Sequence, residues 1–145
     1  MNIVILGCGR VGALLATQLE NAGHAVTIID SSNDSFQRLD SGFKGDKVTG
    51  NGVDEEILRR ARVEEADAFI AVTNGDNRNI MACQMAKQLF SVKKVLCRIY
   101  DPLRESTYKE IGLETFCPTL LGANMLFNAI ENKQRQSGVA PEAKR

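Results

Sequence analysis

The N-terminal segment constrains the fold more than any other part of the chain. Residues 3–6 form a continuous apolar run, Ile-Val-Ile-Leu, which is typical of a strand buried on both faces of a parallel sheet. Residues 7–12 follow directly and read Gly-Cys-Gly-Arg-Val-Gly, which fits the pattern G-x-G-x-x-G. Apolar residues with helical spacing come next, at Val11, Leu14, Leu15 and Leu19. A buried strand, a glycine turn and an amphipathic helix in this order predict the start of a doubly wound α/β sheet.

Strand-like and helix-like segments alternate through the rest of the 145 residues. Further strands are predicted at residues 25–29, 47–49, 68–72, 95–100 and 115–117. Parallel strands joined by helices require right-handed crossovers. The pattern therefore predicts a single α/β domain, a Rossmann-type doubly wound parallel sheet of six strands.

Local signals place the helices between these strands. Ser32 is expected to cap a helix that runs to Leu39, and Asp54 is expected to cap the next helix. The pair Asp101-Pro102 predicts a further helix start, because proline is tolerated in a first turn. The helix after residues 68–72 is expected to present one apolar side, made by Met81, Met85 and Leu89.

The last predicted helix covers residues 119–133 and is apolar on more than one side. A helix that is apolar beyond a single stripe needs burial on a second side. Either it packs deeply in this domain or it contacts another subunit, and we favour the subunit contact. Residues 1–133 are thus expected to form the folded domain, and the polar residues 134–145 a flexible tail.

The glycine segment indicates a phosphate-binding loop. Gly7 permits a tight turn, Gly9 lets the backbone approach a diphosphate, and Gly12 lets helix and strand pack closely. The N-terminus of the following helix offers free N–H groups and the positive end of the helix dipole to phosphates. The alternative is a tight turn that binds nothing.

Asp30 strengthens the ligand interpretation. It ends the second predicted strand, where a carboxylate can accept hydrogen bonds from ribose hydroxyls. A carboxylate there would repel a 2′-phosphate, which disfavours NADP; the alternative role of Asp30 is helix capping. Arg10 can direct its guanidinium at phosphates or can be an ordinary surface residue. Cys8 lies beside the helix N-terminus, a position that can lower the pKa of a thiol.

Composition excludes several other classes of protein. Eighteen basic and 18 acidic residues give a formal net charge of zero, so strong attraction to nucleic acid or anionic membrane is not expected. No apolar run approaches the roughly 20 residues that span a bilayer, and the N-terminus lacks a signal-peptide pattern. The four cysteines have no C-x-x-C spacing, which argues against zinc and a disulfide framework. We therefore expect a cytoplasmic protein without a metal site.

Several segments together resemble a known family. Arg10 stands within the glycine loop, Asp30 follows the second strand, and residues 50–54 read Gly-Asn-Gly-Val-Asp. Residues 73–79 read Thr-Asn-Gly-Asp-Asn-Arg-Asn after the fourth strand, and Arg98 lies in the fifth. In these features the sequence resembles the N-terminal nucleotide-binding domain of the Trk/Ktr potassium-uptake regulatory subunits, the RCK or KTN domain. Asn51 departs from the family pattern, in which an acidic residue is usual.

The resemblance implies a cytosolic subunit that gates a potassium transporter or channel. Such domains bind ATP, ADP or NAD(H), assemble into dimers and rings, and sit on the inner face of the membrane through an integral-membrane partner. ATP, ADP, AMP and NADH share their adenosine half, so the sequence leaves the choice among them open. The expected nucleotide contacts are Gly7, Cys8, Gly9, Arg10, Val11, Gly12, Asp30, Ser31, Asn51, Gly52, Thr73, Asn74, Asn77 and Arg98.

We expect a regulatory subunit rather than an enzyme, and we weigh two alternative functions below it. An NAD-dependent oxidoreductase would need an acid–base group near the nicotinamide. The single histidine, His24, lies in a turn after the first helix and away from the expected site. Tyr100 and Tyr108 are candidates for this group, but no motif spacing indicates either of them. A redox sensor would act through Cys8, although an inert loop cysteine is the simpler interpretation. Thr73 and Asn74 also have an alternative role as helix caps.

Overall fold

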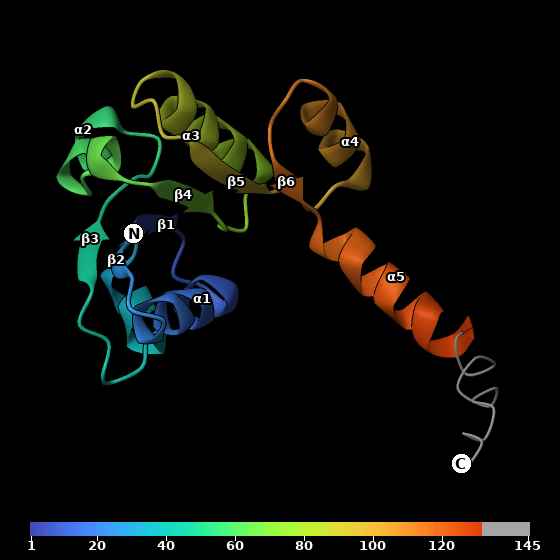
Figure 1. Ribbon diagram of the computed structural model, residues 1–145, viewed down its shortest axis with the longest axis horizontal. Helices are drawn as coiled ribbons and strands as arrows, with labels where there is room; N and C mark the ends of the chain where they lie inside the picture. Colours follow the sequence, from blue (N-terminus) through green and yellow to red (C-terminus); the bar gives the residue numbers. More distant parts are fainter. Residues whose placement is uncertain (132–145) are drawn as a thin grey trace, which may run out of the picture.

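The computed structural model describes residues 1–131 and contains one six-stranded sheet (Figure 1). Its strand order is β3-β2-β1-β4-β5-β6, and every neighbouring pair is parallel. The strands are β1 (Asn2–Leu6), β2 (Ala25–Asp30), β3 (Asp46–Thr49), β4 (Ala68–Ala71), β5 (Lys94–Arg98) and β6 (Thr115–Phe116). The predicted doubly wound sheet of six parallel strands is confirmed.

Helices cover both faces of this sheet. They are α1 (Arg10–Asn21), η1 (Asn33–Arg38), α2 (Glu55–Arg60), η2 (Val63–Glu65), α3 (Asp76–Gln88), α4 (Pro102–Glu110) and α5 (Pro118–Glu131). Helices α1 and η1 pack on one face, whereas α2 and α3 pack on the other (Figure 1). The chain thus crosses from one face to the other between β3 and β4, as a doubly wound sheet requires.

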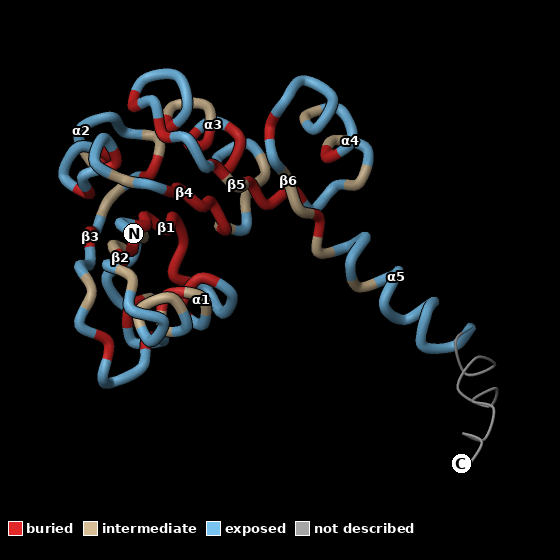
Figure 2. Tube along the Cα trace, viewed as in Figure 1, coloured by how far each residue is buried: buried red, intermediate tan, exposed pale blue. Residues whose placement is uncertain are grey.

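Strand β1 shows why the central strands are uniformly apolar. Val4 and Leu6 belong to the core under α2 and α3, while Ile3 and Ile5 belong to the core under α1. Alternate side chains point to opposite faces of a strand, and both faces are covered here. The central strands accordingly show as buried segments in Figure 2.

The predicted apolar stripe of the first helix is only partly correct. Val11 and Leu14 are exposed at 45% and 61%, and the buried residues of α1 are Gly12, Ala13 and Ala16. A Cβ atom at Gly12 would overlap the carbonyl oxygen of Gly7, so the helix begins in direct contact with the turn. That close approach places small residues against the sheet and turns larger ones outward.

Helix α3 shows a similar departure from the predicted side. Met81 and Leu89 are exposed at 56% and 58%, and Met85 is only partly buried. The buried side instead comprises Asn79, Ile80, Ala82, Cys83 and Ala86. Small side chains allow α3 to lie close to β4 and β5. Because Asn79 is polar, this buried face does not follow the apolar spacing of an amphipathic helix.

The predicted cap at Asp54 and the predicted helix start at Asp101-Pro102 are both present. Asp54 accepts from the N–H of Glu56, and Asp101 accepts from the N–H of Leu103. The prediction for Ser32 is wrong, because its side chain caps nothing and the segment after it forms the short 3₁₀ helix η1 rather than an α-helix. The backbone N–H of Ser32 is held by the Asp30 carboxylate instead.

Helix α5 extends away from the sheet and has no buried residue (Figures 1 and 2). Its large exposed apolar residues are Leu120, Leu121, Met125, Leu126, Phe127 and Ile130. Deep packing of this helix within the domain is therefore excluded for the described chain. No helix within residues 1–131 is both long and apolar enough to cross a membrane. The predicted tail at 134–145 lies outside the described residues.

Candidate functional site

A cavity of about 1190 Å³ opens where β1, β2 and β4 end, next to the first turns of α1 and α3. Ligands of doubly wound sheets bind at this edge, outside the carboxyl ends of the strands. Eleven of the fourteen residues expected to contact a nucleotide line it: Gly7, Gly9, Arg10, Asp30, Ser31, Asn51, Gly52, Thr73, Asn74, Asn77 and Arg98. The fold therefore brings together segments that are separated widely in the sequence.

The glycine loop forms the floor of this cavity. Gly7 has a φ of +107°, and a Cβ atom there would lie 2.9 Å from the backbone nitrogen of Thr73. Gly9 is the N-cap of α1, has no capping side chain, and would have open space around an added Cβ. The N–H groups of the first helical turn therefore lie beside a backbone that a phosphate can approach closely.

Three of the expected contact residues do not line the cavity. Cys8 is fully buried, its thiol donates to the carbonyl of Ser35, and its N–H donates to Asp30. Val11 is half-exposed on α1, and Gly12 serves the contact between helix and turn.

The environment of Cys8 opposes a reactive thiolate. Burial, reinforced by the Asp30 carboxylate, raises the pKa of the Cys8 thiol to about 11. The helix N-terminus was expected to be able to lower this pKa, but desolvation dominates. A thiol of this kind stays protonated near neutral pH, whereas redox-sensing cysteines are exposed thiolates.

Asp30 is held in a fixed orientation at the end of β2. One carboxylate oxygen accepts from the N–H of Cys8 at 2.8 Å, and the other accepts from the N–H of Ser32 at 2.9 Å. A carboxylate has about four acceptor sites, so each oxygen can still accept a ligand hydroxyl. Asp30 is the one carboxylate among the residues that line the cavity.

Four arginines converge on the same cavity: Arg10, Arg38, Arg78 and Arg98. None of them forms an ion pair with a carboxylate of residues 1–131. Four guanidinium groups against one carboxylate give this edge a positive local charge in a chain of zero net charge. Arg38 was not expected here, because no motif marks it and only folding brings η1 to the loop. Arg78 belongs to the segment 73–79, but it was not among the expected contacts.

Arg98 is the most buried of these cations, with 7% of its surface exposed. Its Nε and Nη2 atoms donate to the carbonyl of Thr73 at 3.2 and 2.6 Å, and its guanidinium lies 4.6 Å from the centre of the Tyr100 ring. Burial lowers the pKa of Arg98, while Tyr100 and Asp76 act in the opposite direction. A buried guanidinium without a carboxylate partner is suited to an anionic ligand.

The segment after β4 combines cavity contacts with structural ones. Gly75 is the N-cap of α3, so neither Thr73 nor Asn74 has the alternative role of helix cap. Asp76 accepts from the N–H groups of Tyr100 and Asp101 and does not line the cavity. Asn77, which does line it, accepts from Arg104 at 2.6 Å.

The loop after β3 also reaches the cavity. The side-chain oxygen Oδ1 of Asn51 accepts from the N–H of Val53 at 3.2 Å, so Asn51 shapes its own turn. A Cβ atom at Gly52 would overlap the side chain of Leu6, which accounts for glycine at this position. Asn51 therefore keeps its amide group at the cavity without the negative charge that an acidic residue would bring.

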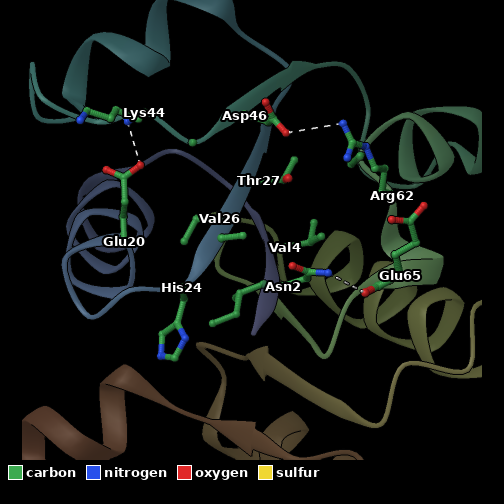
Figure 3. A pocket seen from close by; sticks show the side chains of 14 residues that line it. Asn2, Val4, Glu20, His24, Val26, Thr27, Lys44, Asp46, Arg62 and Glu65 are labelled. Carbon is green, nitrogen blue, oxygen red and sulfur yellow. Dashed lines mark hydrogen bonds and ion pairs between the residues drawn. The ribbon is translucent and has the colours of Figure 1, made fainter.

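A second, smaller cavity of about 260 Å³ lies at the opposite edge of the sheet (Figure 3). Its polar groups are joined to one another: Lys44 donates its N–H to Glu20, Asn2 donates to the carbonyl of Glu65, and Arg62 pairs with Asp46 at 4.0 Å. His24 lines this cavity and not the glycine loop, as expected from its position in the sequence. Tyr100 and Tyr108 line neither cavity.

Residues 3–118 match the TrkA-N domain family. The chain belongs to the TrkA-N family. The resemblance seen in the sequence is thereby confirmed. This TrkA-N domain is 52% identical over 115 residues to the Trk system potassium uptake protein TrkA of Streptomyces coelicolor, covering 79% of the chain and 52% of that relative. It is 36% identical over 111 residues to a TrkA homologue of Pyrococcus abyssi, covering 77% and 49%.

Solved structures share the architecture. The TrkA-N domain of the Escherichia coli inner membrane protein ybaL matches with a TM-score of 0.78 at 20% identity, covering 88% of this chain and 95% of that one. The GsuK structure bound to ADP matches with a TM-score of 0.76 at 25% identity, covering 91% of this chain and 34% of that one. The TrkA-N domain spans about half the length of the curated relatives it matches.

Proposed function

We propose that this TrkA-N domain binds an adenine nucleotide in the cavity above the glycine loop and serves as a regulatory part of a potassium uptake system. One observation carries the proposal. A glycine loop at a helix N-terminus, a fixed carboxylate and four arginines line a single cavity, and the arginines have no carboxylate partner within residues 1–131. Phosphates would complement the arginines and the helix N-terminus, while the carboxylate would complement ribose hydroxyls.

Each group has a role in this proposal. The diphosphate lies over Gly7 and Gly9 with Arg10 beside it, and Asp30 with Ser31 holds the ribose. The loop at Asn51 and Gly52 and the residues Thr73, Asn74, Asn77 and Arg98 contact the adenine or the distal phosphate. ATP, ADP, AMP and NAD(H) remain candidates, because all of them carry adenosine and phosphate. A GsuK structure that shares this fold was solved bound to ADP, which supports such a ligand.

The regulatory role rests on the relatives and on α5. The relatives are named as Trk system potassium uptake proteins, so we place this domain on the cytoplasmic side of a membrane potassium transporter or channel. Helix α5 exposes six large apolar residues, and burying them against a second copy would remove that surface from water. We infer that the domain acts as a homo-oligomer, a dimer that assembles into a ring.

A contiguous set of contacts joins the cavity to the start of α5. The Arg98 guanidinium lies over the Tyr100 ring, and the Tyr100 carbonyl accepts from the thiol of Cys117 and from the hydroxyl of Thr119 at 2.8 Å. A phosphate that moves Arg98 would therefore act on the point where α5 leaves the sheet. A ligand that interacts differently with two arrangements of α5 shifts their populations, and the membrane partner responds to the shift.

Calorimetric titration with ATP, ADP, AMP, NAD, NADH and NADPH, beside light scattering for mass, tests the proposal. We expect binding of at least one adenine nucleotide, weak or no binding of NADPH, and a mass above that of a monomer. Binding restricted to NAD or NADH by a monomer would favour an oxidoreductase. No binding of any of these ligands would overturn the nucleotide proposal.

The variant Phe127→Glu tests the subunit contact separately. A charge in the centre of the exposed apolar surface of α5 should lower the mass measured by light scattering, because it would be buried in the proposed contact. Glu131→Gln at the end of the same helix is the control and should leave the mass unchanged. An unchanged mass of Phe127→Glu would show that α5 does not form the contact.

A further inference from the structure

Asn79 is a completely buried polar side chain at the start of α3, with 0% of its surface exposed. Its oxygen accepts from the N–H of Thr73 at 3.0 Å and from the Thr73 hydroxyl at 2.6 Å. Its amide group donates to the carbonyls of Thr73 and Arg98, both at 3.0 Å. An asparagine side chain offers two donor hydrogens and two acceptor sites, and all four are used here.

These bonds join two strands just beyond the end of their ladder. The last paired residues of β4 and β5 are Ala71 and Cys97. Beyond this pair the ladder ends, and Thr73 and Arg98, which follow the two strand positions, both line the cavity. The amide of Asn79 reaches Thr73 on one side and Arg98 on the other. Asn79 therefore sets the distance between the two segments where no backbone bond of the ladder does so.

The carbonyl of Thr73 is also the acceptor that holds the Arg98 guanidinium. The Thr73 carbonyl oxygen accepts hydrogen bonds from Nε and Nη2 of Arg98 in addition to the bond from the Asn79 amide. Asn79 thus fixes both the acceptor of the guanidinium and the backbone that carries it. Asn79 itself does not line the cavity, so any effect on a ligand must pass through these neighbours.

We propose that Asn79 is a positioning residue for anion recognition, which holds the Arg98 guanidinium at the cavity in the orientation that receives a phosphate. The identity of the anion, a phosphate group of an adenine nucleotide, rests on the proposed function. The positioning of Arg98 does not rest on the proposed function, because it is a property of the protein without ligand. Two measurements separate these parts.

The first measurement follows the Arg98 Nε–H signal by NMR in the protein without ligand. The variant Asn79→Ser removes both donors to the carbonyls, and Asn21→Ser at the exposed end of α1 is the matched control. We expect hydrogen exchange at Arg98 Nε to become about tenfold faster or more in Asn79→Ser and to stay unchanged in the control. Asn79→Ala, which removes the donors without adding a charge, serves if the serine variant does not fold. An unchanged exchange rate in a folded variant would overturn the proposal.

The second measurement compares ADP with adenosine, which lacks phosphate. We expect Asn79→Ser to weaken ADP binding by about tenfold, with adenosine affinity within about twofold, and to have no further effect in an Arg98→Met background. Equal losses for both ligands, or a loss that persists without Arg98, would show that Asn79 does not act through Arg98. If the unaltered protein binds no nucleotide, the proposed function fails and the exchange measurement alone decides the role of Asn79.

Discussion

The two edges of the sheet carry cavities of opposite character. At the carboxyl ends of the strands, four arginines face a cavity with one carboxylate and have no ion-pair partner in the described chain. At the amino ends, the smaller cavity is lined by two cations, Lys44 and Arg62, and by three carboxylates, Glu20, Asp46 and Glu65, and Arg62 pairs with Asp46 (Figure 3). Both edges are rich in charged residues, yet the two signs nearly balance at the amino edge, whereas positive charge exceeds negative charge at the carboxyl edge.

The direction of the strands explains this difference. Every strand is parallel, so α1 and α3 begin at the carboxyl edge and present their N-termini there. Helix N-termini carry free N–H groups and a partial positive charge, which add to the arginines. Surface ion pairs such as Arg62 with Asp46 contribute about 0 to 1 kcal/mol and need no ligand. Charge alone therefore does not indicate a site, whereas charge without a partner at a helix N-terminus does.

Gly12→Ala should have the largest effect and would show that the carboxyl edge depends on close backbone contact. The added Cβ would overlap the carbonyl of Gly7, so we expect a loss of about 3 kcal/mol in the free energy of unfolding, measured with denaturant. Gly9→Ala is the matched control, because its Cβ meets open space and its stability should change little. Equal stability of the two variants would contradict the close contact.

Arg98→Met and Arg62→Met compare the two edges directly. Removing the buried guanidinium should weaken ADP binding by about tenfold to a hundredfold, because a charge-assisted bond to phosphate is lost. Arg62→Met removes a cation from the opposite edge and should leave ADP affinity unchanged. Calorimetric titration measures both. Equal losses in the two variants would mean that only the overall charge matters and would break the distinction between the edges.

Asp30→Asn tests the single carboxylate of the larger cavity, and Asp46→Asn is its control. Asp30→Asn keeps an acceptor for a backbone N–H but removes the charge that would repel a 2′-phosphate, so NADPH should gain about tenfold relative to NADH. Asp46→Asn, at the opposite edge, should leave this ratio unchanged. Competition titration gives the ratio. An unchanged ratio of NADPH to NADH affinity in Asp30→Asn would contradict the proposed contact between Asp30 and the ribose.

The smallest effect concerns pH and Cys8. An unfolded thiol releases its proton near pH 9.0, but the buried thiol of Cys8 does so near 11. The folded protein therefore holds this proton more tightly, and the stability that Cys8 contributes is complete below pH 9 and falls as pH rises toward 11. Unfolding by denaturant at about pH 8 and about pH 10 should show a steeper loss in the unaltered protein than in Cys8→Ala. Parallel losses would indicate an exposed thiol.

Much of the fold could be predicted because its signals are local. Continuous apolar runs indicated the central strands, and the caps at Asp54 and Asp101 require only residues two positions away. The glycine loop was predictable for the same reason, since Gly7 has a positive φ and Gly12 meets the carbonyl of Gly7 in the same loop. The sequence also placed Asp30 at the end of the second strand and Arg98 within the fifth, and the structure ends β5 at Arg98. Parallel strands bring such ends to one edge.

Tertiary structure alone decided which side chains reach that edge and what they meet there. Arg38 lines the cavity because η1 packs on the sheet at a contact that no spacing in the sequence specifies. The segment 73–79 was marked in the sequence, but only the fold shows that Asn79 joins the ends of β4 and β5. Close packing of small residues likewise turned Leu14 outward, and burial rather than the helix dipole set the pKa of Cys8. Local sequence thus determined the elements and the turn between them, whereas long-range packing determined burial, charge pairing and the contents of the site.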